Sequence, residues 1–314
     1  MRAVKPADVS AGSLDDERFR VGYILSSSYS GSTLLTLLLA SHPGIATIGE
    51  LKAQSLGDLD SYWCSCGELL RACRFWRRFR EVCVRLGLPG DPGDFQTHFR
   101  VRSRPWLDRV MRARVRARSF ELVRELILGF TPGAVSRIVE QNRRLIGAVL
   151  DLQRAMVFVD GSKDPVRLKY FARSGFFDLR VIHLIRDGRG VASSFAKHEG
   201  LTIDAAAREW HSTHAECLRA LEYVPRTSAM TLHYESLCGD AEGTLDRVFA
   251  FLGLPPRERN GPNNVEHHIL GNGMRLSFPG RVSLDEKWRS SLSQRDLATF
   301  DRVAGALNSR LGYR

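Results

Sequence analysis

A short polar loop after an apolar stretch carries the first residues with an evident chemical use. Residues 21–25, VGYIL, are apolar, and a leucine-rich stretch that begins at position 34 follows soon after. Between them stand the small polar residues Ser30, Gly31, Ser32 and Thr33. Backbone N–H groups at the start of a helix have no partner within the helix and attract an anion, and hydroxyl groups add further donors. The pattern therefore predicts a phosphate-binding loop.

This loop lacks the lysine of a nucleotide-hydrolysing P-loop, G-x-x-x-x-G-K-[ST]. Ser32 stands where that lysine is expected, and no glycine occupies the required upstream position. A kinase or an NTPase would thereby lose the cation that reaches the outer phosphates, together with its magnesium site. The structural alternative for this stretch alone is an ordinary capped helix.

A second candidate phosphate site follows the apolar stretch 179–185, LRVIHLI. Arg186 ends this stretch, and Ser194 lies eight residues later in a predicted helix that begins at 190. A guanidinium at a strand end and a hydroxyl two turns into the next helix can hold one phosphate from two sides. Arg189 either assists them or is a solvated turn residue.

These motifs require strands and helices that place them together. Strands are predicted at 21–25, 155–160, 179–185 and 229–234, and helices at 32–41, from 190 onward and at 241–252. Strands that alternate with helices predict an α/β fold, here a P-loop-like parallel sheet flanked by helices, and ligands bind beyond the carboxyl ends of such strands. Because each motif directly follows a strand, one shared site is expected.

The predicted organisation is a flexible N-terminal arm over 1–20 and a single domain over 21–314. A loop and a cysteine-rich segment are expected at 45–85. A basic helical insertion is expected at about 93–153, where apolar residues recur at roughly helical spacing. These residues are Val110, Val115, Phe120, Val123 and Ile127. The arginines between them are interpreted as a solvated face or, alternatively, as a docking surface for an acceptor.

The charge of the chain restricts its partners. The formal net charge is +11, and only six of the 46 basic residues are lysines. Such a bias toward arginine is typical of GC-rich coding, and the remaining basicity suits an anionic ligand or an acidic acceptor. No nucleic-acid-binding module is recognisable, so no nucleic-acid partner is expected.

Without a secretory signal or an apolar run long enough to span a membrane, a soluble cytoplasmic protein is expected. The sequence does not indicate an oligomeric state.

Three of the six cysteines, Cys64, Cys66 and Cys73, fall within the stretch CSCGELLRAC. The spacing C-x-C-x6-C lacks the C-x2-C pair that is usual in zinc sites, and no histidine is near in the sequence. A local structural role is the interpretation, with a metal site or a disulfide as alternatives.

Taken together, these motifs resemble those of the sulfotransferases that use 3'-phosphoadenosine-5'-phosphosulfate (PAPS). YSGSTLL at 29–35 resembles their 5'-phosphosulfate loop, and Arg186 with Ser194 resembles their 3'-phosphate motif. Further similarity lies in SKDPVRL at 162–168, LHYESL at 232–237, the following VFAFLGLP, and EKW at 286–288. The resemblance covers about 20 to 312 outside the basic helical region. Within this superfamily the chain looks most similar to tyrosylprotein sulfotransferases and their bacterial relatives.

The resemblance implies transfer of a sulfuryl group from PAPS, as co-substrate, to an acceptor hydroxyl without a metal. It implies that Glu50, in HPGIATIGE, is the general base and that Lys163 stabilises the transferred and leaving groups. It further implies that Ser30 to Thr33 hold the 5'-phosphate and that Tyr234 contacts the nucleotide. Lys287, beside Trp288, is expected to close a late loop over the nucleotide. The alternatives are a surface carboxylate for Glu50 and an ion pair of Lys163 with Asp164.

The sequence departs from the family at Tyr29, where a lysine or arginine is usual. Either Lys163 carries more of the charge stabilisation, or an arginine of the basic helices completes the site, or the protein is slow or inactive. Ile48 and Gly161 stand near positions where the family's lumenal enzymes have cysteines, which favours a cytoplasmic relative. The alternative functions are a non-catalytic nucleotide-binding protein of the same fold and a small-molecule kinase. The acceptor class stays open among a small metabolite, a glycan, a lipid and a peptide tyrosine.

The histidines are further candidates for the base, namely His183, His198, His211 and His214. His183 lies within an apolar strand and is expected in the core. The glycine-rich stretch 266–281 is expected as a loop over the site.

Overall fold

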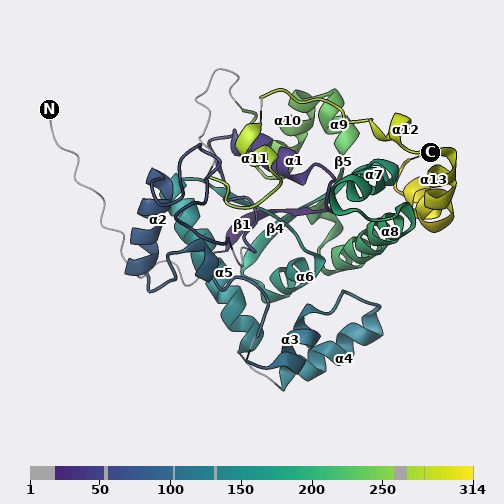
Figure 1. The fold of residues 1–314 in the computed structure, drawn as a ribbon. Coiled ribbons are helices and arrows are strands. Elements are labelled where there is room, and N and C mark those ends of the chain that lie inside the picture. The colour runs from purple at the N-terminus through teal and green to yellow at the C-terminus, as the bar shows by residue number, and fades with distance from the viewer. Residues whose placement is uncertain are drawn as a thin grey trace.

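A five-stranded parallel sheet forms the centre of the protein (Figure 1), as seen in a computed structural model that describes residues 18–52, 56–101, 103–130, 133–257, 267–278 and 280–313. The strands are β1 (Phe19–Leu25), β2 (Ile45–Ala46), β3 (Val157–Lys163), β4 (Phe177–Ile185) and β5 (Ala229–His233), in the order β2-β3-β1-β4-β5. Every neighbouring pair is parallel. The expected α/β class with a parallel sheet is confirmed.

The central strands are apolar on both faces because helices cover both. Val21, Tyr23 and Leu25 belong to one core cluster, whereas Ile24 belongs to the cluster on the opposite face. Successive side chains of a strand point to opposite faces, so a strand buried on both sides needs a continuous apolar run. This explains why VGYIL could be recognised as a strand.

Two layers of helices cover the sheet (Figure 1). On one face lie α1 (Ser32–Ala40), α9 (Tyr234–Gly239) and α10 (Ala241–Phe251), and on the other lie α5 (Ala134–Gln153) and α6 (Pro165–Ser174). A third core cluster joins α7 (Gly188–Glu199) and α8 (Ile203–Ala220) to α13 (Gln294–Phe300). Three shorter helices complete the described C-terminal part: α11 (Met274–Ser277), α12 (Trp288–Ser291) and α14 (Ala306–Arg310). None of the described helices is both long and apolar enough to cross a membrane.

Several boundaries differ from the sequence-based expectation. Strand β1 begins at Phe19, so the end of the expected arm belongs to the sheet, while residues 1–17 lie outside the described part of the chain. The region expected as a loop contains the helix α2 (Arg74–Arg85), which buries Phe75, Trp76, Phe79 and Cys83. Its arginine-rich outer face obscured this apolar stripe. Strand β2 was not predicted, because two residues carry too little pattern.

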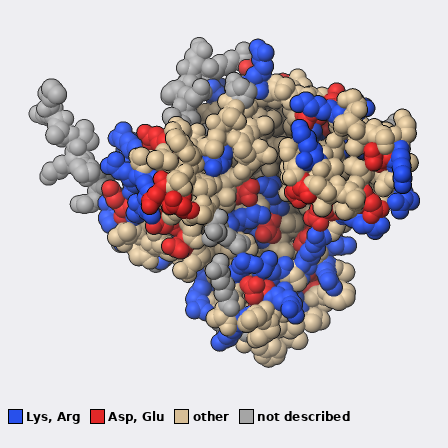
Figure 2. Space-filling model, in the orientation of Figure 1, with Lys and Arg blue, Asp and Glu red and all other residues tan. Residues whose placement is uncertain are grey.

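The basic insertion is helical, with α3 (Pro105–Arg112) and α4 (Arg118–Gly129) before α5. The expected orientation of α4 is wrong. Phe120 and Val123 are 58% and 57% exposed, whereas Arg124 is buried. α3 and α4 extend away from the sheet (Figure 1). In Figure 2 the far end of this region is accordingly mainly tan, with blue side chains where it meets the rest of the protein.

Buried charges determine how α4 lies. Glu121 of α4 accepts a hydrogen bond from Lys169 Nζ of α6 at 2.8 Å and forms an ion pair with Arg124 at 3.3 Å. Burying a charge is costly unless it is paired and hydrogen-bonded. Because Lys169 of α6 pairs with Glu121, the charged side of α4 faces the body of the protein and its apolar side faces solvent.

Two histidines meet in the core between the sheet and α8. His183 of β4 and His214 of α8 are buried, and the distance between His183 Nε2 and His214 Nδ1 is 3.2 Å. The expected core position of His183 is thus observed. Burial lowers the pKa of His183 to about 4 and the pKa of His214 to about 3, so both rings are neutral at pH 7.

This pair should make the protein sensitive to acid. The unfolded chain takes up protons near the usual pKa of 6.5, whereas the folded pair resists protonation until about pH 4. The stabilising contribution is therefore present above pH 6.5 and is lost as the pH falls toward 4, at about 1.4 kcal/mol per pH unit for each proton. Urea unfolding at pH 7 and pH 5 measures the loss. The double variant His183→Leu, His214→Leu should have a smaller difference between the two pH values, and an unchanged difference would contradict this assignment.

Candidate active site

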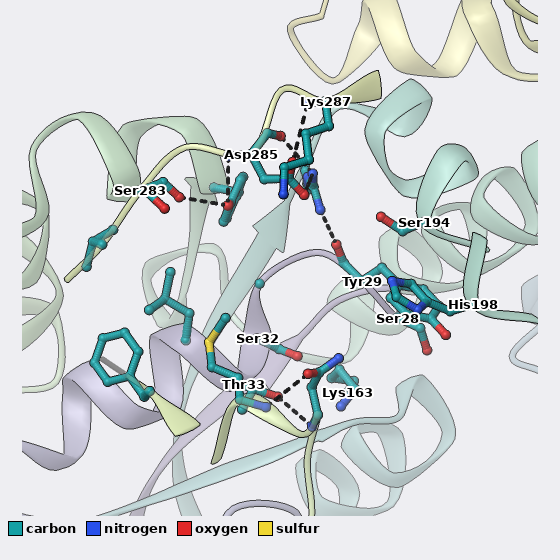
Figure 3. Close-up of a pocket in the computed structure, with 18 of the residues that line it drawn as sticks. Ser28, Tyr29, Ser32, Thr33, Lys163, Ser194, His198, Ser283, Asp285 and Lys287 are labelled. Carbon is teal, nitrogen blue, oxygen red and sulfur yellow. Dashed lines mark hydrogen bonds and ion pairs between the residues drawn. The ribbon is translucent and has the colours of Figure 1, made fainter. Parts of the chain in front are cut away.

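A pocket of about 580 Å³ opens beyond the carboxyl ends of β1, β3 and β4, and Figure 3 shows its lining. In this view Ser32, Thr33 and Lys163 lie at one end, Asp285 and Lys287 at the other, and Tyr29, Ser194 and His198 along one side. Predicted site residues that line it are Tyr29, Gly31, Ser32, Thr33, Glu50, Lys163, Arg186, Ser194, Tyr234 and Lys287. The structure therefore brings together every predicted site residue except Ser30.

The loop after β1 approaches Tyr234 closely because it contains a glycine. Gly31 has φ +87° and precedes α1, and a Cβ atom there would lie 2.5 Å from Tyr234 Cδ2. Ser30 is fully buried, and its hydroxyl shares a hydrogen bond of 2.6 Å with Ser27 Oγ. The hydroxyl of Ser30 thus stabilises the loop from within, while the first N–H groups of α1 point beyond the helix end.

Tyr29 is held against α7. Its hydroxyl donates a hydrogen bond of 2.9 Å to Glu199 Oε1, and its ring stacks on His198 with ring centroids 5.7 Å apart. Burial raises the pKa of Tyr29, and the Glu199 carboxylate raises it further, so the phenol is neutral. Tyr29 therefore supplies no positive charge to the pocket. Its backbone has φ +61°, which is uncommon for a residue with a side chain.

Glu50 and Lys163 form an ion pair at the end of the pocket next to α1. Lys163 Nζ donates to Glu50 Oε1, and both side chains are 16% exposed. Lys163 also has a positive φ, +62°. Glu50 lies within the pocket, and the ion-pair partner of Lys163 is Glu50, whereas Asp164 accepts hydrogen bonds from Val166 N and Arg167 N at the start of α6.

One buried carboxylate positions both of these residues. Asp160 of β3 accepts hydrogen bonds from Leu51 N at 3.4 Å and from Ser162 N at 2.9 Å. These are the neighbours of Glu50 and Lys163 in the chain. Arg167 Nε donates to Asp160 at 2.8 Å, and both side chains are almost fully buried. Asp160 thereby holds together the segment that carries Glu50 and the segment that carries Lys163, which are far apart in the sequence.

Arg186 occupies the opposite end of the pocket. It donates hydrogen bonds of 3.0 Å to Tyr29 O and of 2.8 Å to Asp285 O, and it also contacts Asp285 Oδ2 at 3.2 Å. Its guanidinium lies 4.8 Å from the centre of the Tyr234 ring. The Ser194 hydroxyl donates a hydrogen bond of 2.9 Å to Gly190 O. Its oxygen can still accept a hydrogen bond, and the hydroxyl can rotate to donate to another group.

Of two charged residues near Arg186, Asp285 lines the pocket and Arg189 is not among its lining residues. Burial alone would raise the pKa of Asp285, but the backbone N–H of Lys287 and the Arg186 guanidinium outweigh it and lower the pKa, so Asp285 is ionised. Arg189 forms an ion pair with Asp187 at 2.7 Å and lies 4.6 Å from the ring centre of Trp288. Arg189 therefore connects α7 to α12.

The segment after residue 266 supplies residues that sequence reasoning missed. Asn272 donates its backbone N–H to Thr33 Oγ1 at 3.1 Å, and Asn272, Met274, Phe278 and Arg281 line the pocket. The glycine-rich composition of 266–281 indicated a covering loop, and its described part does cover the site. No residue pattern singled out these positions. Of the described residues within 93–153, none lines this pocket, and the arginines that line it are Arg186 and Arg281.

The four candidate histidines lie in three different places: at the pocket, on the surface of α8 and in the core. His198 lines the pocket beside Tyr29, whereas His211 is exposed on α8 and is not among the lining residues. His183 and His214 are buried in the core pair described above. His198 is thus the one histidine of these four that contacts the pocket.

The protein is an α/β protein with a parallel sheet, helices on both faces and a polar pocket at the carboxyl edge of the sheet, which is where proteins of this class usually bind ligands. The chain belongs to the sulfotransferase family, whose family model matches residues 23–258. Membership of this family supports sulfuryl transfer as the general chemistry.

Solved structures of low sequence identity are similar to this chain, and the first described here agrees with it in fold. The sulfotransferase domain from the curacin biosynthetic pathway is 17% identical, with a TM-score of 0.53 over 95% of this chain and 99% of that one. The sulfotransferase domain from the Synechococcus PCC 7002 olefin synthase is 20% identical, with a TM-score of 0.49 over 96% of this chain and 97% of that one. A comparison with curated proteins finds no match.

Proposed function

We propose that this protein transfers a sulfuryl group from PAPS to an acceptor hydroxyl, with Glu50 as general base and Lys163 as the cation beside the transferred group. The observation that carries the proposal is the Glu50–Lys163 ion pair, which lies in one pocket with the helix start at Ser32 and with Arg186. A base, a cation and two phosphate-binding elements are the parts that such a transfer needs.

The pocket fits a nucleotide that carries several negative charges. Four cationic side chains line it, namely Lys163, Arg186, Arg281 and Lys287. We assign the 5'-phosphosulfate to the first N–H groups of α1 and the hydroxyls of Ser32 and Thr33. We assign the 3'-phosphate to Arg186 and Ser194, with Tyr234 and Lys287 beside the nucleotide. A volume of about 580 Å³ is within the usual range of ligand pockets.

In the proposed step, an acceptor oxygen forms a bond to sulfur as the bond from sulfur to the bridging oxygen breaks. The acceptor proton passes to a Glu50 oxygen. The electron pair of the broken bond stays with the leaving phosphate, and Lys163 Nζ neutralises the charge there. The neutral Tyr29 supplies no positive charge for this task, so we assign most of it to Lys163, with Arg281 as a further cation that lines the pocket.

Binding of the desulfated product, adenosine 3',5'-bisphosphate, tests the cofactor assignment. It should bind more tightly than adenosine 5'-monophosphate or ATP, because only it offers a 3'-phosphate to Arg186. Arg186→Ala should weaken its binding by roughly 10- to 100-fold, the effect of one or two charge-assisted hydrogen bonds. Isothermal titration calorimetry measures each affinity.

The matched control is Arg208→Ala, which removes an arginine whose contacts are with Asp204 on the surface of α8. This variant should bind like the unaltered protein. Equal or tighter binding of ATP, or no binding of the bisphosphate, would overturn the assignment of PAPS.

One observation favours a second candidate, a nucleotide-binding protein of this fold without catalysis. Tyr29 is neutral, and its hydroxyl is engaged by Glu199 at the place where the family has a cation. In that case nucleotide binding would depend on Arg186 as above, but no acceptor would be sulfated. A small-molecule kinase, the remaining alternative, would require ATP and magnesium. The acceptor is proposed as a hydroxyl compound, whether metabolite, glycan, lipid or peptide tyrosine.

A further inference from the structure

Four potential metal ligands meet away from the pocket, although they are far apart in the sequence. Cys64, Cys66 and Cys73 come from the segment before and at the start of α2, and His267 precedes α11. Cys64 and Cys73 are buried, and Cys66 and His267 are partly buried. Each residue offers one ligand atom, and all four atoms lie within 4.8 Å of one another. Local spacing in the sequence could not associate this histidine with the cysteines, because it lies 194 positions beyond Cys73.

Four of the six distances between these ligand atoms match the edges of a tetrahedron around one ion, and the other two are at most 4.8 Å. The Sγ atom of Cys73 lies 3.6 Å from that of Cys66 and 3.9 Å from that of Cys64. The Nδ1 atom of His267 lies 3.4 Å from Cys73 Sγ and 3.6 Å from Cys64 Sγ. Zinc bonds of about 2.3 Å to sulfur and about 2.0 Å to nitrogen place tetrahedral ligands about 3.8 Å and about 3.6 Å apart. A disulfide would instead need about 2.0 Å between two sulfurs.

The backbone around the cysteines is shaped to present them together. Gly67 has φ +87°, its N–H donates to Cys64 O at 3.1 Å, and Cys64 N donates to Glu68 O at 2.9 Å. This tight turn directs Cys64 and Cys66 to the same side. The His267 ring stacks on Phe75, with ring centroids 4.5 Å apart and planes 5° apart. Its orientation is therefore fixed before any ion binds.

We propose that Cys64, Cys66, Cys73 and His267 bind one zinc ion in a structural site. Three thiolates and one imidazole are a typical ligand set of structural zinc, whereas iron–sulfur clusters usually take four cysteines. Four protein ligands leave no open position, so this ion takes no part in sulfuryl transfer. The site thus adds a metal to a protein for which no catalytic metal was expected.

The ion would fasten the segment that covers the pocket. Next to the ligands, Ser65 N donates to His268 O at 3.2 Å, and His268 N donates to Ser65 Oγ at 2.8 Å. A few residues further, Asn272 reaches Thr33 at the start of α1. The zinc site and the phosphate-binding loop therefore hold opposite ends of one short stretch, 267–272.

Metal analysis of the purified full-length protein tests the site directly. After dialysis against metal-free buffer containing a reductant, we expect one zinc per chain. Titration of the metal-free protein with Co²⁺ should give the thiolate-to-cobalt charge-transfer band and the intense visible bands of tetrahedral cobalt. The proposal would be overturned by a zinc content near zero without such bands, or by octahedral cobalt spectra.

Ligand variants identify the residues. Cys66→Ser and His267→Gln should each weaken Zn²⁺ binding by at least about 10-fold, measured by competition with a chromophoric chelator. The matched control, Cys83→Ser, alters a buried cysteine on α2 outside the cluster and should keep one zinc per chain. An unchanged cobalt spectrum in His267→Gln would contradict the fourth ligand.

A second measurement needs no variant. Removal of zinc from the unaltered protein by a chelator should speed amide hydrogen exchange in 267–272 while exchange in β4 stays slow. Equal protection of 267–272 with and without zinc would show that no metal fastens this segment.

Discussion

Replacing Glu50 by glutamine should lower kcat by about 100- to 10,000-fold, the usual contribution of a general base. Glutamine keeps the size of the side chain but cannot accept the acceptor's proton. The affinity for adenosine 3',5'-bisphosphate should change little, because the residues to which we assign its phosphates lie on α1 and at Arg186. Turnover is measured as release of this bisphosphate from PAPS in the presence of a panel of phenols, sugars and tyrosine peptides.

The control for Glu50 is Glu125→Gln on α4, a partly buried glutamate that pairs with Arg173 outside the pocket and should leave kcat unchanged. Lys163→Met should lower kcat to a similar degree as Glu50→Gln. Because base and cation act on the same step, the double variant should lose much less than the product of the two single effects. An active panel member sulfated at the normal rate by Glu50→Gln would show that the base lies elsewhere.

Replacing Arg167 by methionine should destabilise the protein by about 3–5 kcal/mol, because the Asp160 carboxylate would remain buried without its partner. Both side chains are at most 1% exposed, and Arg167 also donates to Thr97 O at 2.8 Å and to Asn142 Oδ1. Urea unfolding measures the loss. Removing both charges, with Asp160→Asn added, should restore part of the stability.

A surface ion pair provides the contrast. Arg173 pairs with Glu125 at 2.8 Å, but its side chain is 49% exposed. Arg173→Ala should cost at most about 1 kcal/mol, because water screens such a pair. If Arg167→Met cost no more than Arg173→Ala, Asp160 would not be the buried anchor of the segments that carry Glu50 and Lys163.

The strands and the loops after them were predictable because β1, β3 and β4 each contain a largely apolar run that a polar motif follows. The order of the strands and the edge strand β2 were not, because pairing joins residues such as Arg20 and Val157 that are distant in the chain. The Glu50–Lys163 ion pair is likewise a product of the fold, and the sequence alone suggested Asp164 as the partner of Lys163.

The errors share one physical cause. Spacing on a single helix shows which residues share a face but not which neighbour that face meets. On α4, the position of Lys169 determines which face of the helix is buried, so that Glu121 and Arg124 face inward. His267 joined the cysteine cluster for the same reason, since a contact between distant segments leaves no trace in local spacing.

The carboxylate of Asp285 already forms an ion pair with the Arg186 guanidinium, so the proposed binding of a nucleotide at this end would exchange one anion for another. The measured affinity then reports the difference between two contacts, and the released aspartate repels the incoming phosphate unless its loop withdraws. Since Asp285 lies two residues before Lys287, the same withdrawal would carry a cation along with it. Under the proposed function, the segment around Asp285 would thus act as a tethered competitor, and the strength of its contact with Arg186 would set how readily the spent nucleotide leaves.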